Sequence, residues 1–363
     1  MLWLRFPHPE PFRHRQRIIP IFLPYHGCPH RCSYCAQHLQ TGAGSPTLED
    51  IHVRMSKELA GLEQSGSRQF GVAFYGGTFT ALPDAWQRRF LAAIHPYRES
   101  GLISHVRCST RPDRISADHL RWLQELGMNM IELGIQSFDQ KVLQASGRGY
   151  DPETAEMACS LVRESGLQLG VQLMPGLPES AMQSWLHDVR RTCALLPEAV
   201  RIYPCLVLKD TLLARQFYAG NYRPWSLPFT TWAISQALLR LWKHGIPVIR
   251  IGLAPEHDLF SAILDGPWHP AMGYLAKSHA LKACILHHLS VLPDVPLHLN
   301  IPKRFAAEFW GHGREHAETW LRYGLSPSHV RTWEHFFFMI TEADPVNFTD
   351  SARVARVARR RSI

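Results

Sequence analysis

The sequence predicts an α/β fold in which a parallel sheet curls into a partial barrel of the (βα)6 type. Short runs rich in β-branched and aromatic residues recur about every 38 residues between residues 20 and 250, as in repeated βα units. The stretches between these runs have the mixed polar and apolar faces of helices. Six or seven such units are fewer than the eight that close a full barrel, so we expect an open one.

The expected elements alternate along the chain. The expected strands are 18–23, 70–75, 105–109, 130–135, 167–173, 200–208 and 248–253. The expected helices are 47–65, 84–99, 117–126, 152–165, 179–195 and 230–244. Helix ends are marked by a capping serine at Ser116 and by glycines such as Gly127 and Gly166. This order predicts a parallel sheet with helical crossovers.

The rhythm of the elements divides the chain into four expected parts. These are a basic N-terminal segment (1–17), the partial barrel (18–254), a small α+β C-terminal extension (255–350) and an Arg-rich tail (351–363). No stretch approaches the ~20 continuous apolar residues of a membrane span. The N-terminus soon becomes polar, which argues against a secretory signal. We therefore expect a cytoplasmic protein without a membrane partner.

The positive charge is concentrated at the two ends of the chain. The formal net charge is +8, of which residues 1–31 carry +4 and residues 351–363 carry +5, leaving −1 for the remainder. Basic termini can attract the phosphate backbone of a nucleic acid, although solubilising termini are the more common case. The charge therefore makes tRNA a possible partner through the termini alone.

Three of the eight cysteines form a motif. Cys28, Cys32 and Cys35 have the spacing CxxxCxxC and follow the first expected strand, whereas the other five are scattered. Three thiolates on one tight loop can hold three irons of a [4Fe–4S] cluster and leave the fourth iron open. A zinc site is the alternative, with a fourth ligand from His26, His30 or His38.

The cysteine motif and the ends of the following strands resemble the radical S-adenosylmethionine (SAM) enzymes. The resemblance is closest to the radical SAM module of the Elongator catalytic subunit and its shorter bacterial relatives. It covers about residues 16–255. The segments that carry it are Tyr75-Gly76-Gly77-Thr78, Ser109-Thr110-Arg111-Pro112-Asp113, Glu132-Leu133-Gly134-Ile135-Gln136-Ser137, Gly147-Arg148-Gly149, Gln172-Leu173-Met174-Pro175-Gly176 and Arg201-Ile202-Tyr203-Pro204.

The resemblance implies a [4Fe–4S] cluster on the three cysteines and SAM at its open iron. The implied SAM-binding residues lie at the expected strand ends, where ligands bind in parallel α/β barrels. In the family, the glycine segment contacts the SAM amino group, the arginine meets the SAM carboxylate, and the tyrosine lies near the adenine. The implied residues are Tyr34, Gly76, Gly77, Thr78, Gln136, Arg148 and Gln172.

Several of these residues also have ordinary structural interpretations. Gly76 and Gly77 could serve a strand-end turn, Gln136 and Gln172 could be satisfied interior amides, and Arg148 could be a solvated charge at a helix end. Further residues are expected only to line the substrate side of the site. They are Arg111, Asp113, Glu132, Tyr203 and Lys209.

The family's chemistry implies reductive cleavage of SAM to a 5′-deoxyadenosyl radical, with an electron donor such as flavodoxin or ferredoxin. The Elongator subunit modifies the wobble uridine of tRNA and carries an acetyltransferase domain. About 110 residues follow residue 254 here, and they show no acetyl-CoA phosphate-binding pattern. The alternative is a small-molecule substrate, tetrapyrrole-like as in oxygen-independent coproporphyrinogen oxidase. That enzyme has a fourth cysteine where this chain has Gln37.

Overall fold

A computed structural model describes residues 3–12, 16–37, 46–253, 257–292 and 297–342. The chain divides into two compact units. The larger unit comprises residues 11–273, and the smaller comprises residues 1–10 and 274–363. Among the described residues, no helix has both the length and the apolar character needed to span a membrane.

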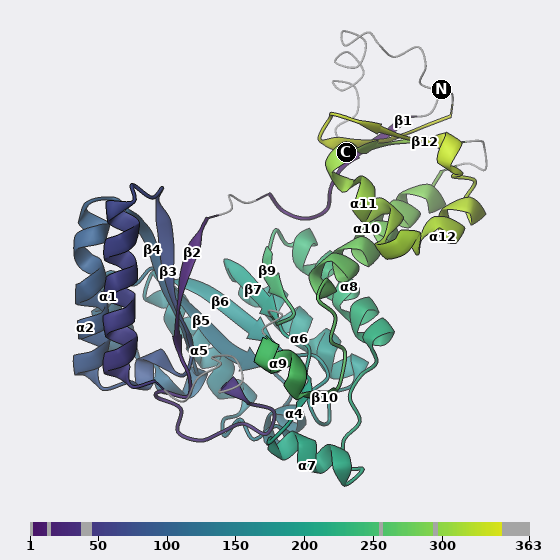
Figure 1. Cartoon of the computed structure of the whole chain (residues 1–363). Helices are drawn as coiled ribbons and strands as arrows, with labels where there is room; N and C mark the ends of the chain where they lie inside the picture. The colour runs from purple at the N-terminus through teal and green to yellow at the C-terminus, as the bar shows by residue number, and fades with distance from the viewer. Residues whose placement is uncertain (1–2, 13–15, 38–45, 254–256, 293–296, 343–363) are drawn as a thin grey trace. The chain divides into compact units, whose positions relative to one another are not determined.

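The larger unit is built on a seven-stranded parallel sheet with the order β2-β3-β4-β5-β6-β7-β9 (Figure 1). Every pairing in it is parallel, and the chain order of the strands is kept across the sheet. The strands are β2 (Ile18–Leu23), β3 (Phe70–Gly76), β4 (Ile103–Thr110), β5 (Met130–Gln136), β6 (Gln168–Leu173), β7 (Ala199–Ile202) and β9 (Val248–Ile251).

Helices cover the outer face of this sheet, and α1 and α2 lie side by side against its first strands (Figure 1). Side-chain caps begin several of them. Ser116 accepts a hydrogen bond from the amide of His119, and Asp151 accepts one from the amide of Thr154. The main helices are α1 (Leu48–Gln64), α2 (Asp84–Glu99), α3 (Ala117–Glu125), α4 (Gln140–Ala145), α5 (Pro152–Glu164), α6 (Met182–Leu195), α7 (Leu212–Tyr218) and α8 (Leu227–Lys243).

A contact across the sheet shows that it is curved. The guanidinium of Arg201 on β7 donates a hydrogen bond to the hydroxyl of Tyr75 on β3. Four strand spacings of about 4.8 Å would separate these strands by roughly 19 Å in a flat sheet. The two side chains can meet only because the sheet curls around them. The α/β partial barrel predicted from the sequence is therefore confirmed.

The expected single strand 200–208 is wrong. The structure has β7 (Ala199–Ile202) and a separate β8 (Val207–Leu208), which pairs antiparallel with β10 (Ile263–Asp265). Pro204 lies between the two strands and has no N–H to donate to a ladder. The amide of Cys205 donates instead to the carbonyl of Pro175, so the chain leaves the parallel sheet here.

The smaller unit is α+β. Its four-stranded sheet has the order β1-β13-β11-β12, and Phe309, Trp320 and Phe338 are fully buried in its core. The rings of Phe309 and Trp320 stack at 4.4 Å between centroids. Its main elements are β1 (Trp3–Pro7), α10 (Met272–Ser290), β11 (His298–Pro302), α11 (Ala306–Trp310), α12 (Ala317–Arg322), β12 (Val330–Trp333) and β13 (Phe337–Thr341).

The observed units differ from the expected division in two places. Residues expected only as a basic N-terminal segment (1–17) contain β1, which pairs antiparallel with β13 and so belongs to the smaller unit. The larger unit continues past residue 254 to residue 273, because β10 pairs with β8. The Arg-rich tail (351–363) lies outside the described residues.

Candidate functional site

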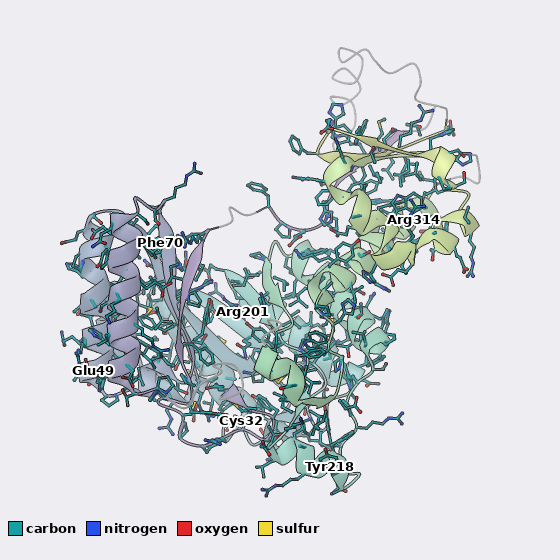
Figure 2. All side chains as sticks on the ribbon, viewed as in Figure 1. Cys32, Glu49, Phe70, Arg201, Tyr218 and Arg314 are labelled. Atoms are coloured by element: carbon teal, nitrogen blue, oxygen red, sulfur yellow. The ribbon has the colours of Figure 1, made fainter. Side chains whose placement is uncertain are left out.

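The three motif cysteines lie on one loop, residues 24–37, which we call the cysteine loop. It follows β2, so it lies at the carboxyl edge of the parallel sheet (Figure 2 labels Cys32). Tight turns shape it: the amide of Cys28 donates to the carbonyl of Tyr25, and that of Cys35 to the carbonyl of Cys32. Burial raises the pKa of the Cys28 thiol and raises that of Cys35 to about 12. Both thiols are therefore protonated at neutral pH until a metal displaces the proton.

The donor set of the loop favours a cluster over a single ion. The loop offers three thiols, one fewer than the four ligands of a structural zinc site, whereas a [4Fe–4S] cluster can take three, each on a different iron. The proposed fourth zinc ligands are also engaged. His26 and His30 bond through Nε2 to the carbonyls of Pro46 and Gly147, at 2.9 Å each, and His38 lies outside the described residues.

The residues at the end of β3 contact the cysteine loop directly. The amide of Gly77 donates to the carbonyl of Leu23 and that of Thr78 to the carbonyl of His26, both at 2.8 Å. A Cβ on Gly77 would lie 2.1 Å from the His26 oxygen, so only glycine allows this approach. The hydroxyl of Thr78 lies 3.3 Å from the sulfur of Cys28. The glycine segment therefore supports the loop.

Gln37 ties the loop to the same strand end. Its side-chain oxygen accepts a hydrogen bond from the amide of Tyr25 at 2.6 Å, and its side-chain nitrogen donates to the carbonyl of Gly76. An amide can make both bonds at once, which a cysteine could not. Gln37 thus has a structural task at the position where the coproporphyrinogen oxidases have a fourth cysteine.

Arg148 is buried against the cysteine loop, so its interpretation as a solvated helix-end charge is wrong. It is only 5% exposed. Its guanidinium donates to the sulfur of Cys32 at 3.1 Å and to the hydroxyls of Tyr34 at 3.3 Å and Tyr150 at 2.9 Å. It also donates to the carbonyl of Gly134. A fixed cation in this position stabilises a thiolate and attracts anions.

Arg111 and Asp113, expected to line the substrate side, form a support for Arg148. Their side chains pair in two parallel hydrogen bonds of 2.8 and 3.0 Å, and Arg111 also donates to the backbone carbonyl of Arg148. The Arg111 side chain is 6% exposed. These bonds hold Arg148 in its position against the cysteine loop.

The two glutamines predicted from the strand ends lie together. The side-chain nitrogen of Gln172 on β6 donates to the side-chain oxygen of Gln136 on β5 at 3.3 Å. Gln136 has φ +69°, a left-handed conformation that a non-glycine residue adopts at a cost, and such residues cluster at functional sites. Tyr34 packs against the buried cluster around Val142, Leu177 and Val207.

A charged cluster lies inside the curl of the sheet. Glu132 on β5 is 3% exposed, and its carboxylate lies 3.1 Å from Nε of Arg107 on β4 and 2.6 Å from Nε of Arg201 on β7. Arg201 donates to the hydroxyls of Tyr203 and Tyr75 (Figure 2 labels Arg201). Glu132 and Tyr203 were expected from the sequence as lining residues. Arg107, Arg201 and Tyr75 were not, because a charged or polar residue within a buried strand was their only signal. Lys209, also named as lining, is exposed on the turn after β8.

Comparisons with known proteins identify the family. The model of the radical SAM superfamily matches residues 22–191, and the model of the radical SAM C-terminal domain matches residues 197–282. The chain belongs to the radical SAM superfamily. It is therefore an enzyme of that class, and radical SAM enzymes use a [4Fe–4S] cluster and SAM as cofactors.

Its relatives include enzymes of tRNA modification and a haem chaperone. The tRNA uridine(34) acetyltransferase of Methanocaldococcus jannaschii is 26% identical over 74% of this chain and 58% of its own length. Elongator complex protein 3 of Mus musculus is 24% identical over 58% of this chain and 46% of its own. The heme chaperone HemW of Bacillus subtilis is 25% identical over 55% and 53%. This radical SAM chain thus spans about half the length of these relatives.

A solved structure agrees with the fold. The archaeal Methanocaldococcus infernus Elp3, with an N-terminal deletion, superposes with a TM-score of 0.56 at 20% identity, covering 77% of this chain and 69% of that one. The likeness extends the radical SAM assignment from sequence to architecture.

Proposed function

We propose that this chain binds a [4Fe–4S] cluster through Cys28, Cys32 and Cys35, cleaves SAM reductively there, and acts on a uridine of tRNA. The observation that carries the cluster assignment is the cysteine loop itself. It presents three thiols with the spacing CxxxCxxC, and it is fixed by backbone bonds to the end of β3 and by the Arg148 contact with Cys32. Three ligands leave one iron open for SAM.

When bound, the cluster and SAM supply a 5′-deoxyadenosyl radical that can take hydrogen from an unreactive C–H bond. The residues of the chain would bind and orient SAM. In the Gly76–Thr78 segment the carbonyl of Gly77 can accept from the amino group of SAM, whereas those of Gly76 and Thr78 already accept from Gln37 and Ala81. Gln136 and Gln172 can donate to and accept from a ribose or an adenine edge. Arg148 would supply the positive charge for the SAM carboxylate, and Tyr34, which accepts a hydrogen bond from Arg148, would contact the adenine.

The electron must come from a separate protein, and we propose a small carrier such as flavodoxin or ferredoxin. His30 and Arg31 of the cysteine loop are exposed. They present a polar, partly cationic surface next to the cluster ligands, which suits the acidic surface of such a carrier.

The proposal of a tRNA substrate rests on two relatives. One is named tRNA uridine(34) acetyltransferase, and the other is Elongator complex protein 3. The basic ends of the chain agree with a nucleic-acid partner. A small-molecule substrate is the alternative, and absent or salt-insensitive tRNA binding would favour it.

Anaerobic reconstitution with iron and sulfide tests the cluster assignment. We expect about four irons and four sulfides per chain and a brown protein. Cys32→Ala should lose the colour and most of the iron, because one ligand and the Arg148 contact are both removed. Cys193→Ala, a cysteine on α6 outside the loop, is the matched control and should keep both. Full iron retention in Cys32→Ala would remove the assignment.

A further inference from the structure

The curled sheet of the larger unit contains a buried positive charge for which the proposed SAM chemistry has no use. Arg107, Arg201 and Glu132 lie on the concave face, which they share with Tyr75 and Tyr203. Two guanidiniums face one carboxylate. All three side chains are 12% exposed or less. Since arginine stays charged at every accessible pH, the cluster carries a net charge of +1 inside the barrel.

The groups around the cluster do not supply a second negative charge. Burial raises the pKa of Tyr75, so its hydroxyl is neutral. His105, on the same face of β4, bonds to Gln168 and has its pKa lowered by burial, so it is neutral as well. Arg250 on β9 donates to the carbonyl of Gly252 and adds a further positive charge. The described residues leave the excess cation unbalanced.

Arg107 is the residue of this cluster whose hydrogen-bond donors have no hydrogen-bond partner among the described residues. Its Nε is buried and lies near Glu132 without the geometry of a hydrogen bond. Within the described chain its two terminal nitrogens have no hydrogen-bond partner, and the centre of the Tyr75 ring lies 5.7 Å from the guanidinium carbon. A buried Nε–H without a well-aligned acceptor is costly. The planar fork of the guanidinium matches a carboxylate or a phosphate.

The sheet face that carries the cluster is partly exposed. On β4 the residues that face the helices are buried, whereas those on the face of Arg107 stay partly exposed. Arg201 pairs in register with Gln172, which bonds to Gln136. Arg107 pairs with Met130, which pairs with Gln168, four residues before Gln172 on β6. A group bound between Arg107 and Arg201 would therefore lie about two residues deeper in the barrel than Gln172, roughly 7 Å along a strand.

We infer that Arg107 and Arg201 form an anchor for an oxyanion of the substrate, a phosphate or a carboxylate, which holds the reacting C–H bond near the radical. Glu132 positions both guanidiniums, and Tyr75 and Tyr203 line the anchor. This inference rests on the proposed function. For a tRNA substrate the oxyanion would be a phosphate next to the target nucleoside.

Calorimetric titration of the full-length chain with uridine 5′-monophosphate and with uridine tests the anchor. We expect the monophosphate to bind at least tenfold more tightly. Arg107→Gln should remove that difference, and Arg107→Lys should keep part of it, because charge remains but the fork is lost. Arg89→Gln, an exposed arginine on α2 paired with Glu49, is the control and should bind like the wild type. Inorganic phosphate and propionate, titrated separately, distinguish a phosphate from a carboxylate anchor.

Protection against phenylglyoxal locates the bound anion without any substitution. Bound monophosphate should slow the modification of Arg107 and Arg201 at least fivefold by peptide mass spectrometry. No protection by any of the anions, or a monophosphate preference that survives Arg107→Gln, would overturn the anchor. Neither result depends on SAM cleavage, so absence of 5′-deoxyadenosine would instead count against the proposed function.

Discussion

Single residues at the strand ends have conformations or contacts that only a few residue types can supply. Gln136 combines a left-handed backbone with a buried amide, and Gly77 combines a strand end with a backbone approach that excludes any side chain. Arg148 distributes its donors over a sulfur, two hydroxyls and a carbonyl. At this scale the site depends on precise local geometry more than on charge alone.

The backbone of Gln136 leads to a stability prediction. Gln136→Val should be less stable than Gln136→Asn by about 2 kcal/mol, because a β-branched residue is strained at positive φ whereas asparagine tolerates it. Chemical denaturation of the two variants measures the difference. Equal stabilities would show that the left-handed conformation of this residue is not maintained.

Gly77 gives a second prediction with a control in the same chain. Gly77→Ala should destabilise the protein by more than about 2 kcal/mol and reduce iron incorporation, because its Cβ would overlap the His26 and Leu23 carbonyl oxygens. Gly61→Ala, in the last turn of α1 with open space around it, should instead stabilise by ~0.5–1 kcal/mol. Thermal unfolding and iron analysis of both variants check this. A Gly77→Ala protein with normal iron content would contradict the close approach.

Whole elements position these residues. The turn that follows β5 is held by Asp188 of α6, whose carboxylate accepts from the hydroxyl of Ser137 and the amide of Phe138. Asp188 is 3% exposed, and burial, its largest effect, raises its pKa to about 7 despite these bonds. Helix α6 thereby fixes the turn directly after Gln136 at the end of β5.

Asp188 predicts a pH dependence of stability. Because its pKa is higher in the folded protein than the 3.8 of a free aspartate, its contribution is fully present below about pH 4 and is lost as the pH rises toward 7. Between pH 5 and 8 the wild type should lose on the order of 2 kcal/mol of unfolding free energy relative to Asp188→Asn. Denaturation at both pH values tests this, and parallel profiles of the two proteins would contradict it.

Most elements could be predicted from the sequence, since β-branched runs and helix caps are local signals. The cysteine loop and the strand-end glutamines could be predicted for the same reason. The contact of Arg201 with Tyr75 could not, because it depends on how far the sheet curls. The pairing of β1 with β13 joins residues more than 300 positions apart, and nothing in the first residues marks their partner. Local pattern thus predicts elements, while curvature and long-range pairing decide which side chains meet.

On the scale of the molecule, the positive charge is concentrated at the two ends of the sequence. Residues 351–363 carry +5 of the net +8. If tRNA is the substrate, deletion of these residues should weaken tRNA binding and make the plot of log affinity against log salt shallower, because fewer phosphates are neutralised. Filter binding between 50 and 200 mM salt would measure both. Absent or salt-insensitive binding by the full chain would favour a small-molecule substrate.

The central claim is that the cysteine loop and the adjoining strand ends support cleavage of SAM. The most direct measurement is the 5′-deoxyadenosine formed when the reconstituted protein is mixed with dithionite and SAM. We expect formation by the wild type and by Cys193→Ala, and loss of at least a hundredfold in Cys32→Ala. No 5′-deoxyadenosine from a wild-type protein that holds about four irons would contradict it.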